Sequence, residues 1–237
     1  AKQTIQSGDK APTAGATTTS QSTLNSEDFF KKYVQKGGYF SNDYPKPKTS
    51  PNYSEMYTEY LGEKPKYVSK GTQLGTFFNS VVTPNYDTLK ELTVELDKQL
   101  TQYPTGNITM VIDSSCSAPA TKAYNVELSK RRIESVIKFF NQTESLKKYI
   151  TAQRLILKTG TAAGENAQVQ QFDSEKGVYI DGKTVSCTDG DPNAAGGDTQ
   201  APSKDIYTTT AMACRRAYIS SITGTLTAPV PTPVPET

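Results

Sequence analysis

The sequence has no histidine and no tryptophan among its 237 residues, and it has only three cysteines. The missing histidine excludes Ser-His-Asp and Cys-His catalytic groups and any histidine metal ligand. The cysteines Cys116, Cys187 and Cys214 form no Cys-x-x-Cys pair, which argues against a structural zinc site. We therefore expect neither a metal nor another cofactor.

A strong charge of one sign and a long apolar run are lacking as well. The net charge is +2 and the mean hydropathy is −0.58. Because no basic stripe dominates, we expect no nucleic-acid partner. No apolar run reaches the roughly 18 residues of a transmembrane helix, so we expect no membrane-spanning segment. Carboxylates, lysines, tyrosines and cysteines remain as acids and bases, but no paired set stands out, and we do not expect an enzyme.

The composition changes along the chain and suggests four regions. Residues 1–28 are rich in threonine, serine and glutamine with no aromatic residue, which predicts a flexible polar arm. Residues 29–71 form a tyrosine-rich extension, residues 72–226 carry a regular pattern typical of one domain, and residues 227–237 form a proline-rich tail. The extension holds seven of the 14 tyrosines. These aromatic side chains should pack either on the following domain or on another protein.

The regular pattern predicts alternating strands and helices. Residues 74–79 indicate a strand, and Thr83 with Pro84 indicates the start of a helix. The helix carries a leucine stripe at spacings of three and four, formed by Leu89, Leu92, Leu96 and Leu100. Further on we expect a strand at 108–112, a helix at 124–141, a helical turn at 144–149, a strand at 154–159, a mostly irregular region at 162–212 with a hairpin at 178–185, and a last strand at 213–226. This order predicts an α+β fold, a two-layer sandwich with helices on one face of a mixed sheet.

One stretch of the second helix resembles a family signature. Residues 124–136 read YNVELSKRRIESV. Asn125, Leu128, Ser129, Arg132 and Val136 fall in register with the signature of the OmpA-like C-terminal, peptidoglycan-associating domain family. The order of the neighbouring strands and helices is similar, and Cys214-Arg215-Arg216 resembles the Asn-Arg-Arg before the family's last strand. The resemblance covers about residues 72–224 and implies a β-α-β-α-β-β sandwich in the periplasm, associated with the outer membrane.

The resemblance also implies a ligand and its contacts. In the family, an arginine binds the carboxylate of diaminopimelate in the peptidoglycan stem peptide, and an aspartate binds its ammonium group. Arg132 matches the arginine and Asn125 matches the signature asparagine. Ser117 stands where the aspartate is expected, and Asp113, four residues earlier, is a candidate substitute. Loss of a charged partner at Ser117 would cost on the order of 1.5–3 kcal/mol. The turn Gly-Tyr-Gly-Glu, expected after the third strand, is altered in residues 160–164.

The three cysteines allow one disulfide or three free thiols. Cys187 and Cys214 flank the long irregular region and are one candidate pair. Such a bond would stabilise the fold by roughly 3 kcal/mol in the chain-entropy account.

Two functions fit these features. The first is noncovalent binding of peptidoglycan that anchors an outer-membrane or envelope assembly. The second is a degenerate OmpA-like structural subunit of a larger secretion or motility machine, without peptidoglycan binding. In the second case, residues 29–70 would contact other envelope proteins.

Overall fold

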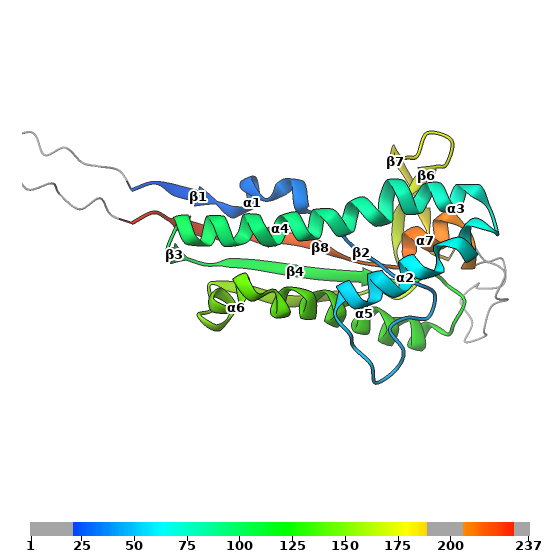
Figure 1. The fold of residues 1–237 in the computed structure, drawn as a ribbon, viewed down its shortest axis with the longest axis horizontal. Coiled ribbons are helices and arrows are strands. Elements are labelled where there is room, and N and C mark those ends of the chain that lie inside the picture. The colour runs from blue at the N-terminus through cyan, green and yellow to red at the C-terminus, as the bar shows by residue number, and fades with distance from the viewer. Residues whose placement is uncertain (1–20, 189–205, 230–237) are drawn as a thin grey trace, which may run out of the picture.

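The structure is a computed structural model that describes residues 21–188 and 206–229. The expectations for residues 1–20 and 230–237 lie outside the described residues. The centre of the molecule is a four-stranded mixed sheet with strand order β2-β8-β4-β5 (Figure 1). β4 and β5 are parallel, and β8 is antiparallel to both β2 and β4. The chain is therefore an α+β protein, which confirms the coarser fold prediction. These strands are β2 (Gly37–Tyr39), β4 (Ile108–Ser115), β5 (Leu155–Ala162) and β8 (Arg216–Thr223).

Helices cover the buried face of this sheet. α5 packs against β4, β5 and β8, α4 packs along β2, and α6 contacts both α4 and α5. The side chains of β4 alternate accordingly: Ile108, Met110 and Ile112 are buried, whereas Thr109, Val111 and Asp113 are half-buried. The helices are α1 (Ser26–Phe29), a 3₁₀ turn (Lys31–Tyr33), α2 (Tyr53–Val68), α3 (Thr72–Phe77), a π-helical turn (Phe78–Val82), α4 (Thr83–Gln102), α5 (Lys122–Gln142), α6 (Glu144–Thr151) and α7 (Thr209–Cys214).

Two smaller sheets lie at the two ends of the main sheet. β9 (Thr225–Thr227) pairs with β1 (Thr23–Asn25) and β3 (Thr105–Gly106), so the two ends of the described chain lie side by side. This pair lies near the beginning of β4, away from the end where β4 runs into α5 (Figure 1). β6 (Gln168–Asp173) and β7 (Val178–Ser186) form an antiparallel pair.

The expected flexible arm is ordered at its end. Its residues 23–28 belong to β1 and α1.

The strand predicted at residues 74–79 is wrong. This stretch belongs to α3 and the π-helical turn, which continue into α4, so Thr83 is not an N-cap. The buried residues Leu74, Phe77, Phe78, Val81 and Val82 repeat at spacings of three and four, a helical rather than a strand period. Pro84 lacks an N–H donor, and the wider π-helical turn just before it accommodates the proline within one continuous helix.

The missing edge strand comes from the tyrosine-rich segment. β2 holds two glycines, and an added Cβ at Gly38 would lie 2.5 Å from the ring of Tyr53. Glycine therefore lets this ring lie on the strand backbone, where Tyr53 Oη accepts a hydrogen bond from the Tyr39 amide at 3.0 Å. The segment contributes a large share of the buried aromatic core: Phe30, Tyr33, Tyr39, Phe40, Tyr53, Tyr57, Tyr60 and Tyr67. Most of its tyrosines thus pack on their own domain.

The end of the expected pattern needs two further corrections. The hairpin predicted within residues 178–185 is wrong, because β7 is one continuous strand that pairs with β6. The strand predicted at 213–226 begins at Arg216 and is divided into β8 and β9, because Ala213 and Cys214 belong to α7. Thr208 caps α7 by accepting a hydrogen bond from the Ala211 amide at 3.0 Å. A disulfide joins Cys187, just after β7, to Cys214 at the end of α7. The region expected to be mostly irregular therefore contains two strands and a helix.

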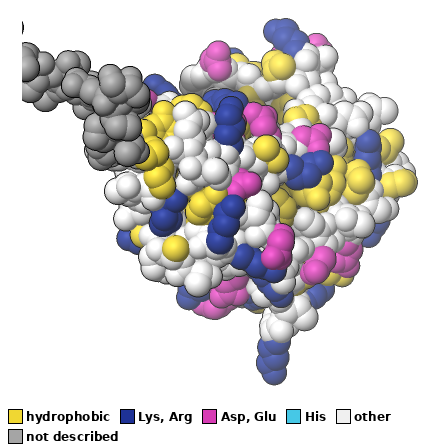
Figure 2. All heavy atoms as spheres, turned by 60° about the vertical axis from the view of Figure 1, so that its left-hand side comes forward, with side chains coloured by type: hydrophobic (Ala, Val, Ile, Leu, Met, Phe, Trp, Pro, Cys, Tyr) yellow, Lys and Arg dark blue, Asp and Glu magenta, His cyan; other side chains and the backbone are white. Residues whose placement is uncertain are grey.

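The described surface mixes charges of both signs. Figure 2 shows lysines and arginines close to acidic side chains across one face, with apolar groups between them. Several of these charges form exposed ion pairs, such as Lys32 with Glu91 at 2.8 Å and Lys90 with Asp87 at 2.7 Å. Within residues 21–188 and 206–229, no helix has the length and apolar character to cross a membrane.

Candidate functional site

A pocket of about 460 Å³ opens where β4 ends and α5 begins. Thr121 caps α5 by accepting a hydrogen bond from the Tyr124 amide at 3.3 Å, which fixes the start of the helix beside the pocket. The pocket is lined by Asn42, Asp43, Cys116, Ser117, Pro119, Ala120, Thr121, Tyr124, Asn125, Leu128, Arg132 and Ile206. Three of the four predicted ligand residues, Asn125, Arg132 and Ser117, are therefore brought together.

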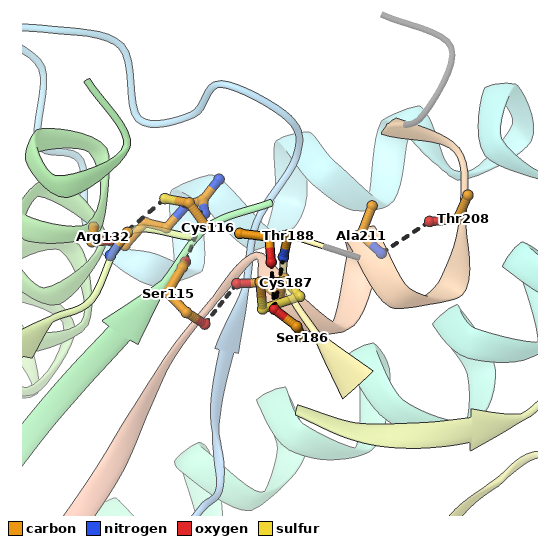
Figure 3. Close-up of a disulfide and its surroundings, with 11 residues drawn as sticks. Ser115, Cys116, Arg132, Ser186, Cys187, Thr188, Thr208 and Ala211 are labelled. Atoms are coloured by element: carbon orange, nitrogen blue, oxygen red, sulfur yellow. Dashed lines mark hydrogen bonds between the residues drawn. A yellow bond between two sulfur atoms is a disulfide. The ribbon is translucent and has the colours of Figure 1, made fainter. Parts of the chain in front are cut away.

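Arg132 is fully buried at the wall of this pocket. Its Nε donates to the carbonyl of Tyr44 at 3.0 Å, and its Nη2 donates to the carbonyl of Ser41 at 3.3 Å. Nη1 donates to the carbonyl of Ser115 at 3.0 Å and to Cys116 Sγ at 3.2 Å (Figure 3). Four of the five N–H donors of the guanidinium are thus engaged. Burial lowers the pKa of Arg132, but a guanidinium remains charged in proteins.

Asp113 does not belong to the site. Its Oδ1 accepts a hydrogen bond from the backbone amide of Thr161 on β5 at 2.9 Å. Gly160 leaves room for this contact, because an added Cβ there would lie 1.9 Å from the same oxygen. The pairing of β4 with β5 shifts register between Ile112 and Ser114. The Asp113 carboxylate therefore satisfies a backbone donor next to this irregularity, and the prediction that it could replace the missing aspartate is wrong.

The acid of the pocket is Asp43, which the sequence did not single out. Asp43 lines the pocket, and its carboxylate accepts hydrogen bonds from the hydroxyl of Tyr124 and from Lys46 Nζ. Burial alone would raise the pKa of Asp43, but these hydrogen bonds outweigh it and hold the pKa below its ordinary value. The pocket thus carries an ionised carboxylate and a guanidinium from two distant segments.

Glu165 is a second acid that the sequence analysis missed. It is buried, and its Oε2 accepts a hydrogen bond from Asn125 Nδ2 at 2.8 Å. The turn before it depends on Gly164, which has a φ of +58° and lies against Val126. Gly164-Glu165 matches the last two residues of the expected Gly-Tyr-Gly-Glu turn, so the signal was present in the sequence, just after the end of β5.

The remaining wall of the pocket depends on Arg215 and the disulfide. Arg215 is fully buried and donates from Nη1 to the carbonyl of Ile206 at 2.9 Å, which holds this lining residue in place. Ser115 Oγ donates to the backbone carbonyl of Cys214 at 2.7 Å, so this disulfide-bonded residue is hydrogen-bonded to the end of β4 next to Arg132 (Figure 3). The third cysteine, Cys116, is a buried thiol, and burial raises its pKa. Cys116 is thus unsuited to act as a nucleophile at neutral pH.

Comparison with known proteins gives no relative: no family model matches the chain, and no curated protein matches it significantly. The described residues also contain no group of three or more acidic or cysteine side chains arranged to hold a metal ion. The side chains that line the pocket offer hydrogen-bond donors, acceptors and two opposite charges.

Proposed function

We propose that this protein binds the peptidoglycan stem peptide noncovalently through the pocket at the start of α5, and so anchors an envelope assembly at the outer membrane. The observation that carries the proposal is that Arg132 and Asp43, two groups of opposite charge, line one pocket that Asn125 and Ser117 also line. A guanidinium suits a carboxylate and an ionised acid suits an ammonium group, so the pocket is complementary to a zwitterionic amino-acid end.

The arrangement of the main sheet supports an OmpA-like assignment. β2, α4, β4, α5, β5 and β8 occur in this order in the chain, as strand, helix, strand, helix, strand and strand, with shorter or additional elements between them. This is the succession that the resemblance implies, with β2 in place of the strand expected at residues 74–79. The disulfide between Cys187 and Cys214 fits a protein of the periplasm, because such bonds persist in oxidising compartments.

Calorimetry of the full chain with a diaminopimelate stem tripeptide tests the proposal. We expect binding by the wild type and a ten- to hundred-fold weaker affinity for Asp43→Asn, because a charge-assisted hydrogen bond contributes about 1.5–3 kcal/mol. Asp87→Asn is a matched control, since Asp87 forms a similar ion pair with the lysine three residues on but does not line the pocket. An equal affinity of Asp43→Asn and wild type, or no heat from either, would contradict the proposal.

A structural role in a larger envelope machine is the second candidate. The hydrogen bonds of Arg132 favour this role. Its Nε and Nη2 already donate to the carbonyls of Tyr44 and Ser41, so these N–H groups are not free to bind a ligand carboxylate. In that role, Arg132 fastens the tyrosine-rich segment to the domain and the protein contacts its envelope partners through the exposed part of residues 29–70. Absence of stem-peptide binding by a folded wild-type chain would favour this role over the first.

A further inference from the structure

The orientation of one amide decides what the pocket offers to a ligand. Asn125 lines the pocket and is almost fully buried. Its Nδ2 donates one hydrogen bond to Glu165 Oε2 at 2.8 Å and another to the carbonyl of Ala120 at 3.1 Å. Both N–H groups of the amide are therefore used, and Oδ1 is the amide atom that remains for a further partner.

Glu165 is what fixes this orientation. Glu165 Oε2 accepts a hydrogen bond from Asn125 Nδ2, and this bond holds the nitrogen of the amide, not its oxygen, toward Glu165. The glutamate itself is held by the turn before it: the Gly164 amide donates to Ser129 Oγ at 3.1 Å, and the Gly164 carbonyl accepts from the Cys116 amide at 2.7 Å. Glu165 is buried and does not line the pocket, so it acts on a ligand only through Asn125.

We propose that Glu165 is a positioning residue that makes the pocket selective for a free ammonium group. With its orientation set, Asn125 presents the acceptor Oδ1, and the Asp43 carboxylate and the Ser117 hydroxyl add two further acceptors in the same pocket. An ammonium group supplies three donors and a charge, whereas an acylated nitrogen supplies one donor and no charge. The inference rests on the proposed function, and it predicts binding of uncross-linked stem peptides in preference to those acylated at the side-chain nitrogen.

The first test needs no ligand. Hydrogen exchange of the Asn125 side-chain amide, followed by NMR, should be slow in the wild type and in Glu165→Gln, because glutamine keeps an acceptor oxygen. It should become at least about ten-fold faster in Glu165→Ala, in which that partner is lost. Asn52 is the internal control, since its Nδ2 donates to Gln142 at the far end of α5. Unchanged exchange of Asn125 in Glu165→Ala would overturn the positioning role.

The second test measures selectivity on the same full-length proteins. The stem tripeptide with a free side-chain ammonium should bind the wild type at least about ten-fold more tightly than its N-acetylated form. This ratio should fall several-fold in Glu165→Ala and be retained in Glu165→Gln. An unchanged ratio in Glu165→Ala, or an equal fall in both variants, would overturn the inference. Failure of the wild type to bind either peptide would refute the proposed function instead, and the exchange experiment would still decide whether Glu165 orients Asn125.

Discussion

Arg132 places a buried charge among backbone carbonyls, without a carboxylate among its hydrogen-bond partners. Its donors satisfy the carbonyls of Ser41 and Tyr44, in the segment after β2, and of Ser115, at the end of β4. The same side chain therefore fastens the tyrosine-rich segment and lines the pocket. A residue with both tasks cannot be removed without a cost in stability, which matters for any binding experiment.

The prediction for Arg132 separates these two tasks. Arg132→Met should lower the free energy of unfolding by about 2–4 kcal/mol, because two buried carbonyls and one partly buried carbonyl lose their donors. Arg132→Lys should lose less, since an ammonium group can still reach some of them. Urea denaturation followed by circular dichroism measures both values. Equal stability of Arg132→Met and wild type would show that these hydrogen bonds are not needed for folding.

Asp43 predicts a pH dependence with a definite sign. Its pKa in the folded protein lies below the ordinary value of 3.8, so its contribution to stability is present above that value and is lost as pH falls through the folded pKa. The difference in the free energy of unfolding between wild type and Asp43→Asn should therefore stay constant from pH 8 to 5 and shrink below about pH 4. Denaturation curves over this range measure it, and a difference that already declines between pH 7 and 5 would contradict the assignment.

At the scale of elements, the helix that begins at Thr72 shows how a local pattern can be misread. Paired aromatic residues Phe77-Phe78 are common in strands, but their spacing to Leu74, Val81 and Val82 is helical. The tertiary structure buries all five against one core. The position beside β8 at the edge of the main sheet is occupied by β2 instead. β2 has only three residues, and no local pattern in the sequence predicted it.

The turn between β5 and β6 offers a prediction at this scale. Gly164 has a φ of +58°, and an added Cβ would lie 3.2 Å from Val126, whereas Gly182 has a φ of +70° and open space around it. Gly182→Ala should cost about 1 kcal/mol for the left-handed conformation alone. Gly164→Ala should cost at least about 1 kcal/mol more, because the turn must also shift away from α5. Thermal denaturation of both variants compares them, and equal losses would mean that the turn gives way without strain.

At the scale of the whole molecule, the two ends of the described chain lie near the beginning of β4 (Figure 1), whereas residues that follow the end of β4 line the pocket. β1 and β9 are paired, so both flanking segments start from the same place.

The disulfide acts on the same scale because it closes a loop of 27 residues. Reduction should lower the free energy of unfolding by about 3 kcal/mol. It should also weaken the pocket wall, since Ile206 lies within this loop. Denaturation with and without reductant measures the loss, and the double variant Cys187→Ala/Cys214→Ala is the control that reductant should leave unchanged. A reductant effect of equal size on that variant would assign the loss to another cause.

The sequence by itself determined the elements whose periodicity is local. The leucine stripe of α4 and the apolar run of β4 each lie within one element, so spacing alone predicted them. Asn125, Arg132 and Ser117 were indicated by the resemblance to a family signature; two of them share α5 and the third lies in the loop before it.

Only the tertiary structure decided which acids join them. Asp43 contacts Tyr124 across 81 residues of chain, and Glu165 contacts Asn125 across 40. Such contacts leave no period in the sequence, because they depend on how β2, β4 and β5 pack against α5. Asp113 is close to the motif in sequence, but its carboxylate accepts a hydrogen bond from the backbone amide of Thr161 on β5. This contact also depends on the packing of the strands and could not be predicted from the local sequence.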